Sequence, residues 1–252
     1  MKFHFISSNT SEAIKAKEEY IKSYNQNDPE LADFIIPIGG DGILLKSLHD
    51  FNELSKPFFG INYGSIGFLM NSANSKDLKE VIKNSKSTDL KPLKMTAKDE
   101  DNKIYDSIAY NEVSLMRQSH QASKFQIKIN ETTRMKELIC DGVLVSTSAG
   151  STAYNLSAHG SILPLDCKLL ALTPISAFRP RRWRGALLSE KNIIEIKVIN
   201  FKDRKVSVTA DNIEFRNIKE VTIQSSKDKN CKILFDNNHS IEDKILNEQF
   251  EY

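Results

Sequence analysis

The chain has 252 residues, with 35 Lys and Arg against 33 Asp and Glu, a formal net charge of +2, and 40% hydrophobic residues. This composition excludes wholesale disorder and collagen-like repeats, and the balanced charge does not by itself point to nucleic-acid binding. The length suits one large domain or two smaller ones.

The sequence predicts a cytoplasmic protein that neither enters a membrane nor binds nucleic acid. The first twenty residues lack the apolar core of a signal peptide. The longest uncharged stretch, residues 142–165, carries nine Ser, Thr, Asn or His residues, so it indicates a buried polar site and not a membrane helix. The three cysteines are widely spaced, which fits reduced thiols, and the five histidines show no metal-ligand spacing.

Residues 1–92 alternate between predicted strands and predicted helices. We expect strands at 3–7, 34–38 and 58–62, and helices at 11–24, 43–51 and 77–84. Repeats of strand, loop and helix at this spacing indicate a parallel α/β sheet. Because the pattern changes after Pro92, we predict an α/β domain over residues 1–92, on which a C-terminal tail at about 236–252 could pack back.

The ten glycines of the chain are confined to two regions. Six lie between residues 39 and 67, and the other four lie between residues 142 and 185. Glycine used as turn filler would be spread more evenly. The distribution therefore predicts two backbone regions that need residues without a Cβ, either for an unusual φ or for close approach of a ligand.

The first of these regions begins with Gly-Gly-Asp-Gly at residues 39–42. A loop between a strand and a helix exposes backbone N–H groups and the positive end of the helix dipole, so we expect Gly39, Gly40 and Gly42 to bind phosphate. Neither the dinucleotide-binding pattern nor Walker A fits this loop. A carboxylate there would repel phosphate, so Asp41 could hold Mg²⁺, accept a proton from an attacking hydroxyl, or cap a helix that begins near Ile43.

Beyond Pro92 the hydrophobic pattern changes to a period of two. Apolar and polar residues alternate at 125–130, 194–198 and 206–208, with charged turns between the runs. We therefore predict a β-rich, antiparallel domain over residues 93–235. One of its expected strands, 107–116, contains Asn111-Glu112.

The second glycine region, residues 141–160, combines a predicted strand at 143–145 with a loop dense in Ser, Thr and Gly and a predicted helix at 153–158. Such a loop offers hydrogen-bond donors and acceptors suited to a ribose, an amide or a phosphate. Tyr154 adds a flat surface for an aromatic base, and Asp141 adds a carboxylate.

Four arginines and the only tryptophan lie within residues 179–184. Arginine binds phosphate in a bidentate manner, so this cluster could hold a phosphate donor. The alternative, which we favour, is an oligomer interface or an exposed loop anchored by Trp183.

Together these motifs resemble, in kind and in order, those of the NAD kinase family. The segments that carry the resemblance are Gly-Gly-Asp-Gly at 39–42, residues 60–69, Asn111-Glu112 and residues 141–157. Gly-Gly-Asp-Gly is shared with lipid kinases and phosphofructokinases, whereas the segment 141–157 is highly specific. The chain departs from the usual family pattern at Ile43, Ile139 and Ala149.

The resemblance implies Mg²⁺-dependent transfer of the γ-phosphoryl group of ATP, or of a phosphoryl group of polyphosphate, to the adenosine 2′-hydroxyl of NAD. It also implies a fold: an α/β N-terminal domain with a parallel sheet plus a β-rich, sandwich-like C-terminal domain, with NAD in the cleft between them. Homo-oligomers, either dimers or tetramers, are common in the family.

By motif position, the resemblance implies that Asp41 is the general base. The residues implied to contact NAD are Asp41, Gly42, Phe68, Leu69, Asn111, Glu112, Asp141, Thr152, Ala153, Tyr154, Asn155, Leu156, Ser157, Ser176 and Asn212. Ser176 matches a position that reaches the site of a neighbouring subunit.

Two alternatives share parts of the pattern. A lipid kinase of the diacylglycerol or sphingosine type would carry the same glycine loop, but we find no basic amphipathic helix suited to a membrane surface. A non-catalytic dinucleotide sensor could use the same fold, yet it would not need the carboxylate of Asp41.

Overall fold

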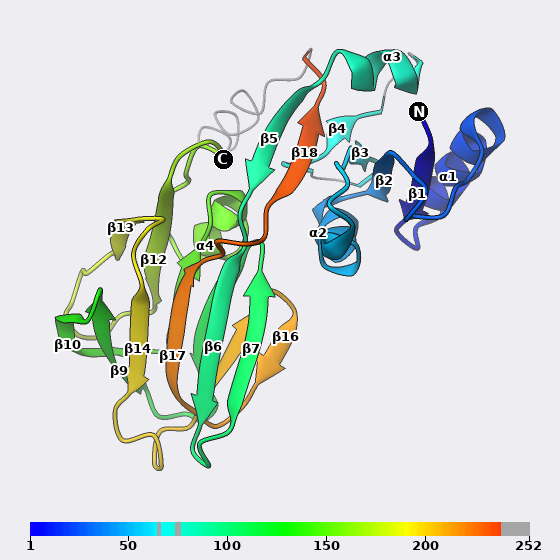
Figure 1. Ribbon diagram of the computed structural model, residues 1–252. Coiled ribbons are helices and arrows are strands. Elements are labelled where there is room, and N and C mark those ends of the chain that lie inside the picture. The colour runs from blue at the N-terminus through cyan, green and yellow to red at the C-terminus, as the bar shows by residue number, and fades with distance from the viewer. Residues whose placement is uncertain (65–66, 74–76, 238–252) are drawn as a thin grey trace. The chain divides into compact units, whose positions relative to one another are not determined.

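The computed structural model describes residues 1–64, 67–73 and 77–237, and Figure 1 shows its course. The chain forms two compact units. Among the described residues, unit 1 consists of residues 1–90 and 229–237, and unit 2 consists of residues 91–228. The sequence placed the divisions at 92/93 and 235/236. The predicted tail at 236–252 lies, beyond residue 237, outside the described residues.

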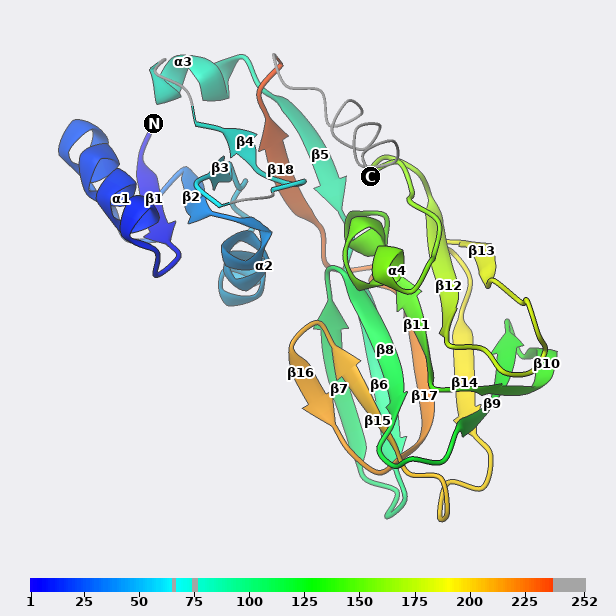
Figure 2. The same ribbon diagram turned by 180° about the vertical axis from the view of Figure 1, so that it is seen from behind.

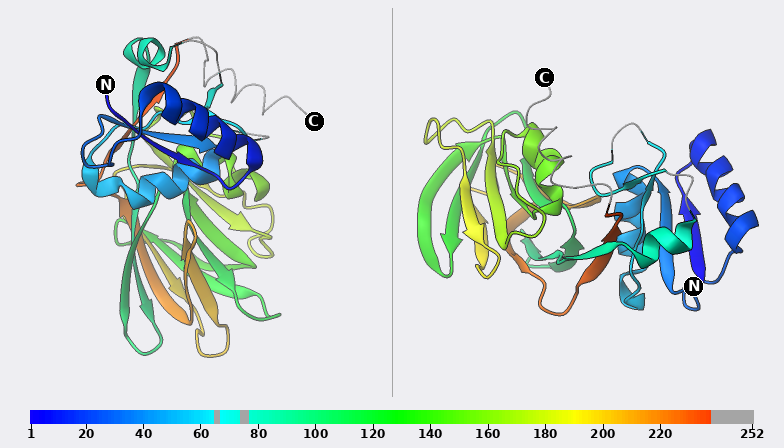
Figure 3. Two further views of the ribbon diagram at one scale, coloured as in Figure 1. Left: turned by 90° about the vertical axis from the view of Figure 1, so that its right-hand side faces the viewer. Right: turned by 90° about the horizontal axis from the view of Figure 1, so that it is seen from above.

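Unit 1 is built on a parallel four-stranded sheet with helices between the strands, as predicted. The strands, in spatial order, are β1 (Phe3–Ser7), β2 (Phe34–Gly39), β3 (Ile61–Asn62) and β4 (Asn71–Ser72). The helices are α1 (Ser11–Tyr24), α2 (Asp41–Asp50) and α3 (Leu78–Lys83), with a 3₁₀ turn η1 (Asn52–Leu54). Figure 3 shows α1 and α2 on opposite faces of β1 and β2.

The sequence of α1 explains why this helix forms and how it packs. The Thr10 side chain caps its first turn by accepting a hydrogen bond from the backbone N–H of Ala13. Ala13 and Ala16 are buried in one apolar cluster with Phe3 and Phe5 of β1. These small residues on one face of α1 let the helix lie close to the sheet. The close packing holds β1 in position.

Helix α2 begins two residues earlier than predicted. Gly40 is the residue before the helix, and Asp41 is its first residue. Since Gly40 has no side chain, no side-chain capping bond closes this helix start. The alternative in which Asp41 caps a helix starting near Ile43 is therefore wrong.

An antiparallel pair of strands, β5 (Lys86–Leu90) and β18 (Cys231–Phe235), completes unit 1. Phe58 bridges Ile35 of β2 and Ile233 of β18, which joins the pair to the parallel sheet. The amide of Asn71, only 2% exposed, donates to the carbonyls of Gly60 and Leu234 and accepts from the N–H of Asp236. Residues 231–235, which the sequence assigned to the second domain, thus pair within unit 1.

Unit 2 is a sandwich of two six-stranded antiparallel sheets, one facing the viewer in Figure 1 and the other in Figure 2. The first sheet has, in spatial order, β10 (Thr132–Cys140), β9 (Ser123–Ile129), β14 (Ile194–Val198), β17 (Ile218–Ser225), β6 (Leu93–Asp99) and β7 (Ile104–Ala109). The second has β13 (Ala186–Ser189), β12 (Leu169–Ile175), β11 (Gly142–Ser146), β8 (Glu112–Arg117), β15 (Val206–Ala210) and β16 (Ile213–Phe215). Apolar residues from both sheets share one buried core, which confirms the predicted β-rich, sandwich-like domain.

The predicted single strand at 107–116 is wrong, because the chain changes sheets inside it. Residues 107–109 belong to β7 in the first sheet, whereas residues 112–116 belong to β8 in the second. Tyr110 and Asn111 make the crossing, and Tyr110 is buried. The alternation breaks at the crossing, where Ile-Ala-Tyr at 108–110 is followed by Asn-Glu at 111–112.

No helix in the described part of the chain is long and apolar enough to cross a membrane.

Candidate functional site

The carboxylate of Asp41 in unit 1 holds two loops together. Its Oδ2 accepts a hydrogen bond from the backbone N–H of Phe68 (2.9 Å), and its Oδ1 accepts one from the N–H of Leu69 (3.0 Å). The positive end of α2 also favours a negative charge at this position. The Gly-Gly-Asp-Gly loop is thereby brought together with residues 68–69, although Asp41 and Phe68 are 27 positions apart in the sequence.

The glycines near Asp41 differ in how the fold uses them. Gly39 has a φ of +149°, and a Cβ there would lie 2.7 Å from Ser8 Oγ. A Cβ on Gly64 would lie 3.2 Å from the Cα of Gly40, so these two backbones are in close contact. Gly42 is different, because its φ is ordinary and a Cβ there would meet no atom of the described residues within 4 Å. Within unit 1, neither backbone conformation nor packing explains a glycine at residue 42.

In unit 2, Asp211 organises the crossing at residues 110–112. Its carboxylate accepts hydrogen bonds from the backbone N–H groups of Tyr110 (2.7 Å), Asn111 (2.9 Å) and Glu112 (3.2 Å). Asp211 itself has a φ of +52° in the turn after β15, a conformation that Asp and Asn tolerate better than most residues. The Asn111-Glu112 backbone is therefore fixed by a residue about one hundred positions away.

Glu112 carries a buried carboxylate oxygen without a partner. Its Oε2 makes no hydrogen bond within the part of the chain that the structure describes. Burial, with a smaller effect of the nearby negative charge of Asp211, raises the pKa of Glu112 to about 7. Buried polar atoms are almost always hydrogen-bonded in native proteins, so an exception of this kind indicates a place for a ligand.

Tyr154 lies near both Glu112 and Asp141, whereas Asp141 itself lies beside Arg117, five residues along β8 from Glu112. Burial, together with the negative charges of Glu112 and Asp141, raises the pKa of the Tyr154 phenol. The Tyr154 side chain is 37% exposed, and its hydroxyl contacts the sulfur of Met116 at 3.6 Å. Asp141 Oδ1 accepts a hydrogen bond from Arg117 Nε at 2.6 Å, so a guanidinium group fixes this carboxylate. Tyr154 is thus within electrostatic range of two carboxylates, Glu112 and Asp141.

The Ser- and Thr-rich loop after β11 serves mainly as a scaffold. Ser146, Thr147 and Ser151 are buried, and their hydroxyls bond to backbone groups of the unit itself. Thr147 Oγ1 donates to the carbonyl of Tyr110 at 2.6 Å, and a Cβ on Gly150 would collide with the Asn111 carbonyl. The hydroxyls of Ser146 and Thr147 thus hold the backbone at Tyr110 and Asn111. The hydroxyl of Ser151 instead bonds to the backbone of Ser148 and Leu163.

The short helix α4 (Tyr154–Ser157), preceded by the 3₁₀ turn η2 (Ala149–Thr152), carries the remaining residues of this motif. Tyr154 and Ser157 are exposed, whereas Thr152, Ala153 and Leu156 are half-buried. Asn155 is fully buried, and its amide bonds to the carbonyls of Ser151 and Ser161 and to the hydroxyl of Thr173. The buried Asn155 side chain therefore holds α4 in place through these hydrogen bonds.

The other predicted residues lie at the surface of unit 2 or beside Asp41 in unit 1. Ser176 is exposed at the end of β12, and Asn212 is exposed in the turn next to Asp211. In unit 1, Leu69 is buried and Phe68 is half-buried. No group of three or more His, Cys, Asp or Glu side chains suited to a metal ion occurs among residues 1–64, 67–73 and 77–237.

Asp211 and Arg117 are site residues that the sequence did not single out. Asp211 stands beside Asn212, which was chosen instead, and its role depends on a contact between distant parts of the chain. Arg117 follows the predicted strand 107–116 and reaches Asp141 from the neighbouring strand. Neither role leaves a local signal in the sequence, because both depend on strand register.

Two family models match the chain. The ATP-NAD kinase N-terminal domain covers residues 1–89, and the ATP-NAD kinase C-terminal domain covers residues 110–235. The NAD kinase of Rickettsia canadensis (strain McKiel) is 52% identical over 233 residues, which is 92% of this chain and 91% of that protein. The NAD kinase of Rickettsia bellii (strain OSU 85-389) is 48% identical over 249 residues, or 99% and 98% of the two chains.

Solved structures show the same fold at lower identity. Yeast NADH kinase complexed with NADH has a TM-score of 0.86 at 21% identity, and the match covers 100% of this chain and 88% of that one. An NAD kinase from Archaeoglobus fulgidus in complex with ATP has a TM-score of 0.77 at 24% identity, covering 98% of each chain.

We predict that Asp211→Asn destabilises unit 2 by about 2–4 kcal/mol, because an amide oxygen cannot replace both carboxylate oxygens as acceptors for three N–H groups. Asparagine suits the same positive φ, so the backbone of the turn is kept. Denaturant unfolding followed by the fluorescence of Trp183, which packs on the unit 2 core, measures the loss. The control is Asp203→Asn in an exposed turn, and equal stability of the two variants would contradict the prediction.

Proposed function

The chain belongs to the NAD kinase family, and from that premise we propose that it transfers the γ-phosphoryl group of ATP to the adenosine 2′-hydroxyl of NAD, giving NADP. The observation that carries this proposal is the buried Oε2 of Glu112, beside Asn111, which has no hydrogen-bond partner among the described residues. A carboxylate oxygen in that position suits a donor such as a ribose hydroxyl. Polyphosphate is the alternative phosphate donor.

Unit 2 supplies the proposed contacts to NAD. Asn111 and Glu112 bind ribose hydroxyls, and the Asp211 carboxylate holds their backbone in position. Tyr154 offers a partly exposed aromatic ring to a base, and Asp141 lies near it. The other proposed contacts are Thr152, Ala153, Asn155, Leu156, Ser157, Ser176 and Asn212. For Asn155 the contact would be made by its backbone, because its side chain is buried and bonded internally.

Unit 1 supplies the proposed chemistry. A secondary hydroxyl is a poor nucleophile at neutral pH, so a carboxylate must accept its proton as the new O–P bond forms. We assign this role to Asp41, whose orientation is fixed by the N–H groups of Phe68 and Leu69. The fold leaves open space at Gly42, which suits close approach of a phosphate group to the loop of residues 39–42. Phe68 and Leu69 complete the proposed contacts to NAD.

Mg²⁺ is the proposed divalent cation. This ion is held in most kinase sites by one or two carboxylates together with the substrate phosphates. Because Asp41 is assigned as the base, the ion would be held mainly by the phosphates of ATP and by water. When bound, the ion would neutralise negative charge on the phosphoryl group.

A homo-oligomer, dimer or tetramer, and a cytoplasmic location complete the proposal. Exposed apolar side chains on β12, on β13 and in the loop between them support self-association. These side chains are Leu169 (37% exposed), Phe178 (52%) and Leu187 (51%).

Incubation of the purified protein with NAD, ATP and Mg²⁺, followed by detection of NADP, tests the proposed reaction. Replacing ATP with polyphosphate in the same assay identifies the donor. A diacylglycerol or sphingosine kinase, or a dinucleotide sensor, would form no NADP, and neither alternative is supported by the comparisons.

We predict that Asp41→Asn lowers kcat by about 10²–10⁴ and changes the affinity for NAD only slightly, because the general base is lost while the NAD contacts of unit 2 remain. Steady-state kinetics and a separate NAD-binding titration measure the two effects. Asp50→Asn, at the other end of α2, is the matched control and should keep full activity. A kcat of Asp41→Asn close to that of the control would refute the assignment of the base.

A second prediction concerns Glu112, whose pKa of about 7 lies above its usual value of 4.5. A ribose hydroxyl that donates to the carboxylate favours the ionised form, so NAD binding lowers this pKa and releases a proton. We expect NAD to bind about tenfold more weakly at pH 6 than at pH 8.

Calorimetry in buffers of different ionisation enthalpy measures the proton release directly. Glu112→Gln keeps the shape of the side chain and should bind NAD without this pH dependence. Proton uptake on NAD binding, or the same pH dependence in Glu112→Gln, would contradict the prediction. Either result would show that the ionised carboxylate of Glu112 does not accept a hydrogen bond from the ribose hydroxyl.

A further inference from the structure

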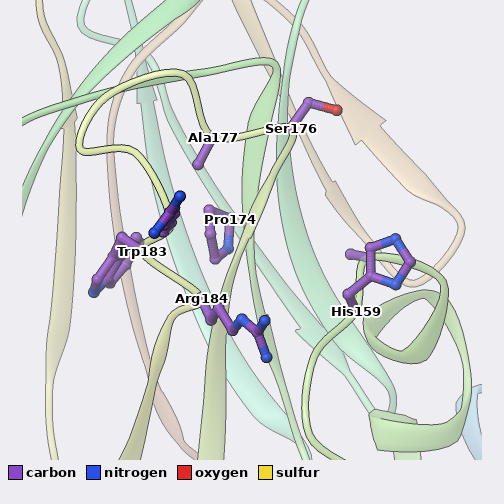
Figure 4. Close-up of a pocket in the computed structure, with 8 residues that line it drawn as sticks. His159, Pro174, Ser176, Ala177, Trp183 and Arg184 are labelled. Carbon is purple, nitrogen blue, oxygen red and sulfur yellow. The ribbon is translucent and has the colours of Figure 1, made fainter.

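The cavity at the end of β12 belongs to the site already proposed for NAD. Ser176, one of the proposed contacts, lines it together with His159 and Trp183 (Figure 4). Asn71 of unit 1, by contrast, takes no part in the contacts proposed for NAD or for phosphate. It is only 2% exposed, so its side chain is too buried to touch a substrate, and any effect on the reaction must pass through other residues.

The Asn71 side chain supplies two donors and one acceptor at once. Its Nδ2 donates to the carbonyl oxygens of Gly60 and Leu234, both at 3.0 Å, and its Oδ1 accepts from the N–H of Asp236 at 2.8 Å. A primary amide offers two N–H donors beside a carbonyl acceptor. A carboxylate in its place would bring two negative oxygens against two carbonyl oxygens. These three hydrogen bonds therefore require an amide at residue 71.

The strand that contains Asn71 is short. β4 is two residues long and lies at the edge of the four-stranded sheet, where β3 is its neighbour. A strand of this length forms only a few ladder hydrogen bonds. The side-chain bonds of Asn71 attach β4 to a second element, because Leu234 lies in β18 and Asp236 follows directly after it. β4 is thereby held by β3 and by β18.

Met70, the residue before Asn71, is fully buried against Gly60. A Cβ on Gly60 would lie 2.4 Å from the Met70 sulfur, so the two residues are in close contact. The carbonyl of the same glycine accepts hydrogen bonds from both the backbone N–H and the side-chain Nδ2 of Asn71. Residues 70 and 71 are therefore fixed against one point of the backbone, just before β3.

The two backbone N–H groups that hold the Asp41 carboxylate lie directly before this fixed point. The Phe68 N–H donates to Oδ2 of Asp41, and the Leu69 N–H donates to Oδ1. Two residues of chain span at most about 7 Å, so Leu69 cannot move independently of Asn71. A displacement of Asn71 would therefore shift the Leu69 N–H, and with it the carboxylate that this N–H orients.

We propose that Asn71 is a positioning residue for phosphoryl transfer. By fixing residues 70 and 71 it holds the N–H groups of Phe68 and Leu69 in place, and these groups orient the carboxylate of Asp41. The proposal rests on the proposed function, in which Asp41 is the general base. Since a misplacement of about 1 Å at a reacting group lowers a rate by up to about 10², loss of the Asn71 amide acts mainly on kcat.

Steady-state kinetics of Asn71→Ala test the proposal. We expect kcat to fall by about ten- to a hundredfold and the KM for NAD to change by no more than about twofold, because most of the proposed NAD contacts lie in unit 2. The matched control is Val81→Ala, which removes buried apolar volume from α3 in the core of unit 1 and should keep the wild-type kcat. Circular dichroism during denaturant unfolding compares the stability of the two variants, and the kinetics are measured where both are folded.

A double-mutant cycle with Asp41→Asn separates positioning from general damage to the fold. Because Asn71 acts through the Asp41 carboxylate, Asn71→Ala should lower the residual kcat of Asp41→Asn by less than about twofold. A further loss in this background as large as in the wild type would overturn the proposal. Equal losses of kcat in Asn71→Ala and Val81→Ala would also overturn it.

A second variant covers the case in which Asn71→Ala does not fold. Asn71→Ser keeps one donor and one acceptor, and it should still lower kcat by at least about threefold relative to Val81→Ala. Wild-type activity in a folded Asn71 variant would overturn the positioning role and leave the proposed function intact. Absence of NADP formation by the wild type would instead refute the proposed function itself.

Discussion

The carboxylate of Asp211 is the constraint on which the ligand-binding end of unit 2 depends. The chain leaves one sheet and enters the other at Tyr110 and Asn111, where the backbone N–H groups belong to neither strand ladder. Asp211 satisfies those groups with its two oxygens. Since unpaired buried amides are costly, this single carboxylate lets the chain change sheets and keeps the side chains of Asn111 and Glu112 free for other partners.

The protein uses its carboxylates in contrasting ways. Asp41 and Asp211 accept hydrogen bonds from backbone N–H groups, which fixes the orientation of both carboxylates. Glu112 has a buried oxygen with no described partner and therefore a raised pKa. A carboxylate that backbone N–H groups hold in place suits a general base, which must be correctly oriented. A carboxylate oxygen without a hydrogen bond suits a contact to a hydroxyl group of the substrate. This division supports separate roles in chemistry and in NAD binding.

Local sequence patterns predicted much of the fold. The helix at 11–24, the parallel strands of unit 1 and the alternating strands of unit 2 follow from hydrophobic period and turn residues. The sheet change inside 107–116 was missed although the alternation breaks there, with Ile-Ala-Tyr at 108–110 followed by Asn-Glu at 111–112. The pairing of β18 with β5 was missed because it joins segments more than 140 residues apart.

Contacts between distant parts of the chain also limited the prediction of the site. Glycine spacing and motif order marked Asp41, Asn111 and Glu112, but the role of Asp211 depends on strand register and could not be found from local pattern. The many Ser and Thr residues after β11 suggested ligand contacts. Several of them are buried, and their hydroxyls form hydrogen bonds with backbone groups instead. The composition of a segment shows how many polar groups it has. Only the fold determines which of those groups remain available to a ligand.

A crystal structure of the protein with NAD bound tests the central claim most directly. The account predicts a ribose hydroxyl oxygen about 2.6–3.2 Å from Glu112 Oε2, with the three N–H bonds of Asp211 intact. NAD bound elsewhere, with Glu112 Oε2 still without a partner, would contradict it.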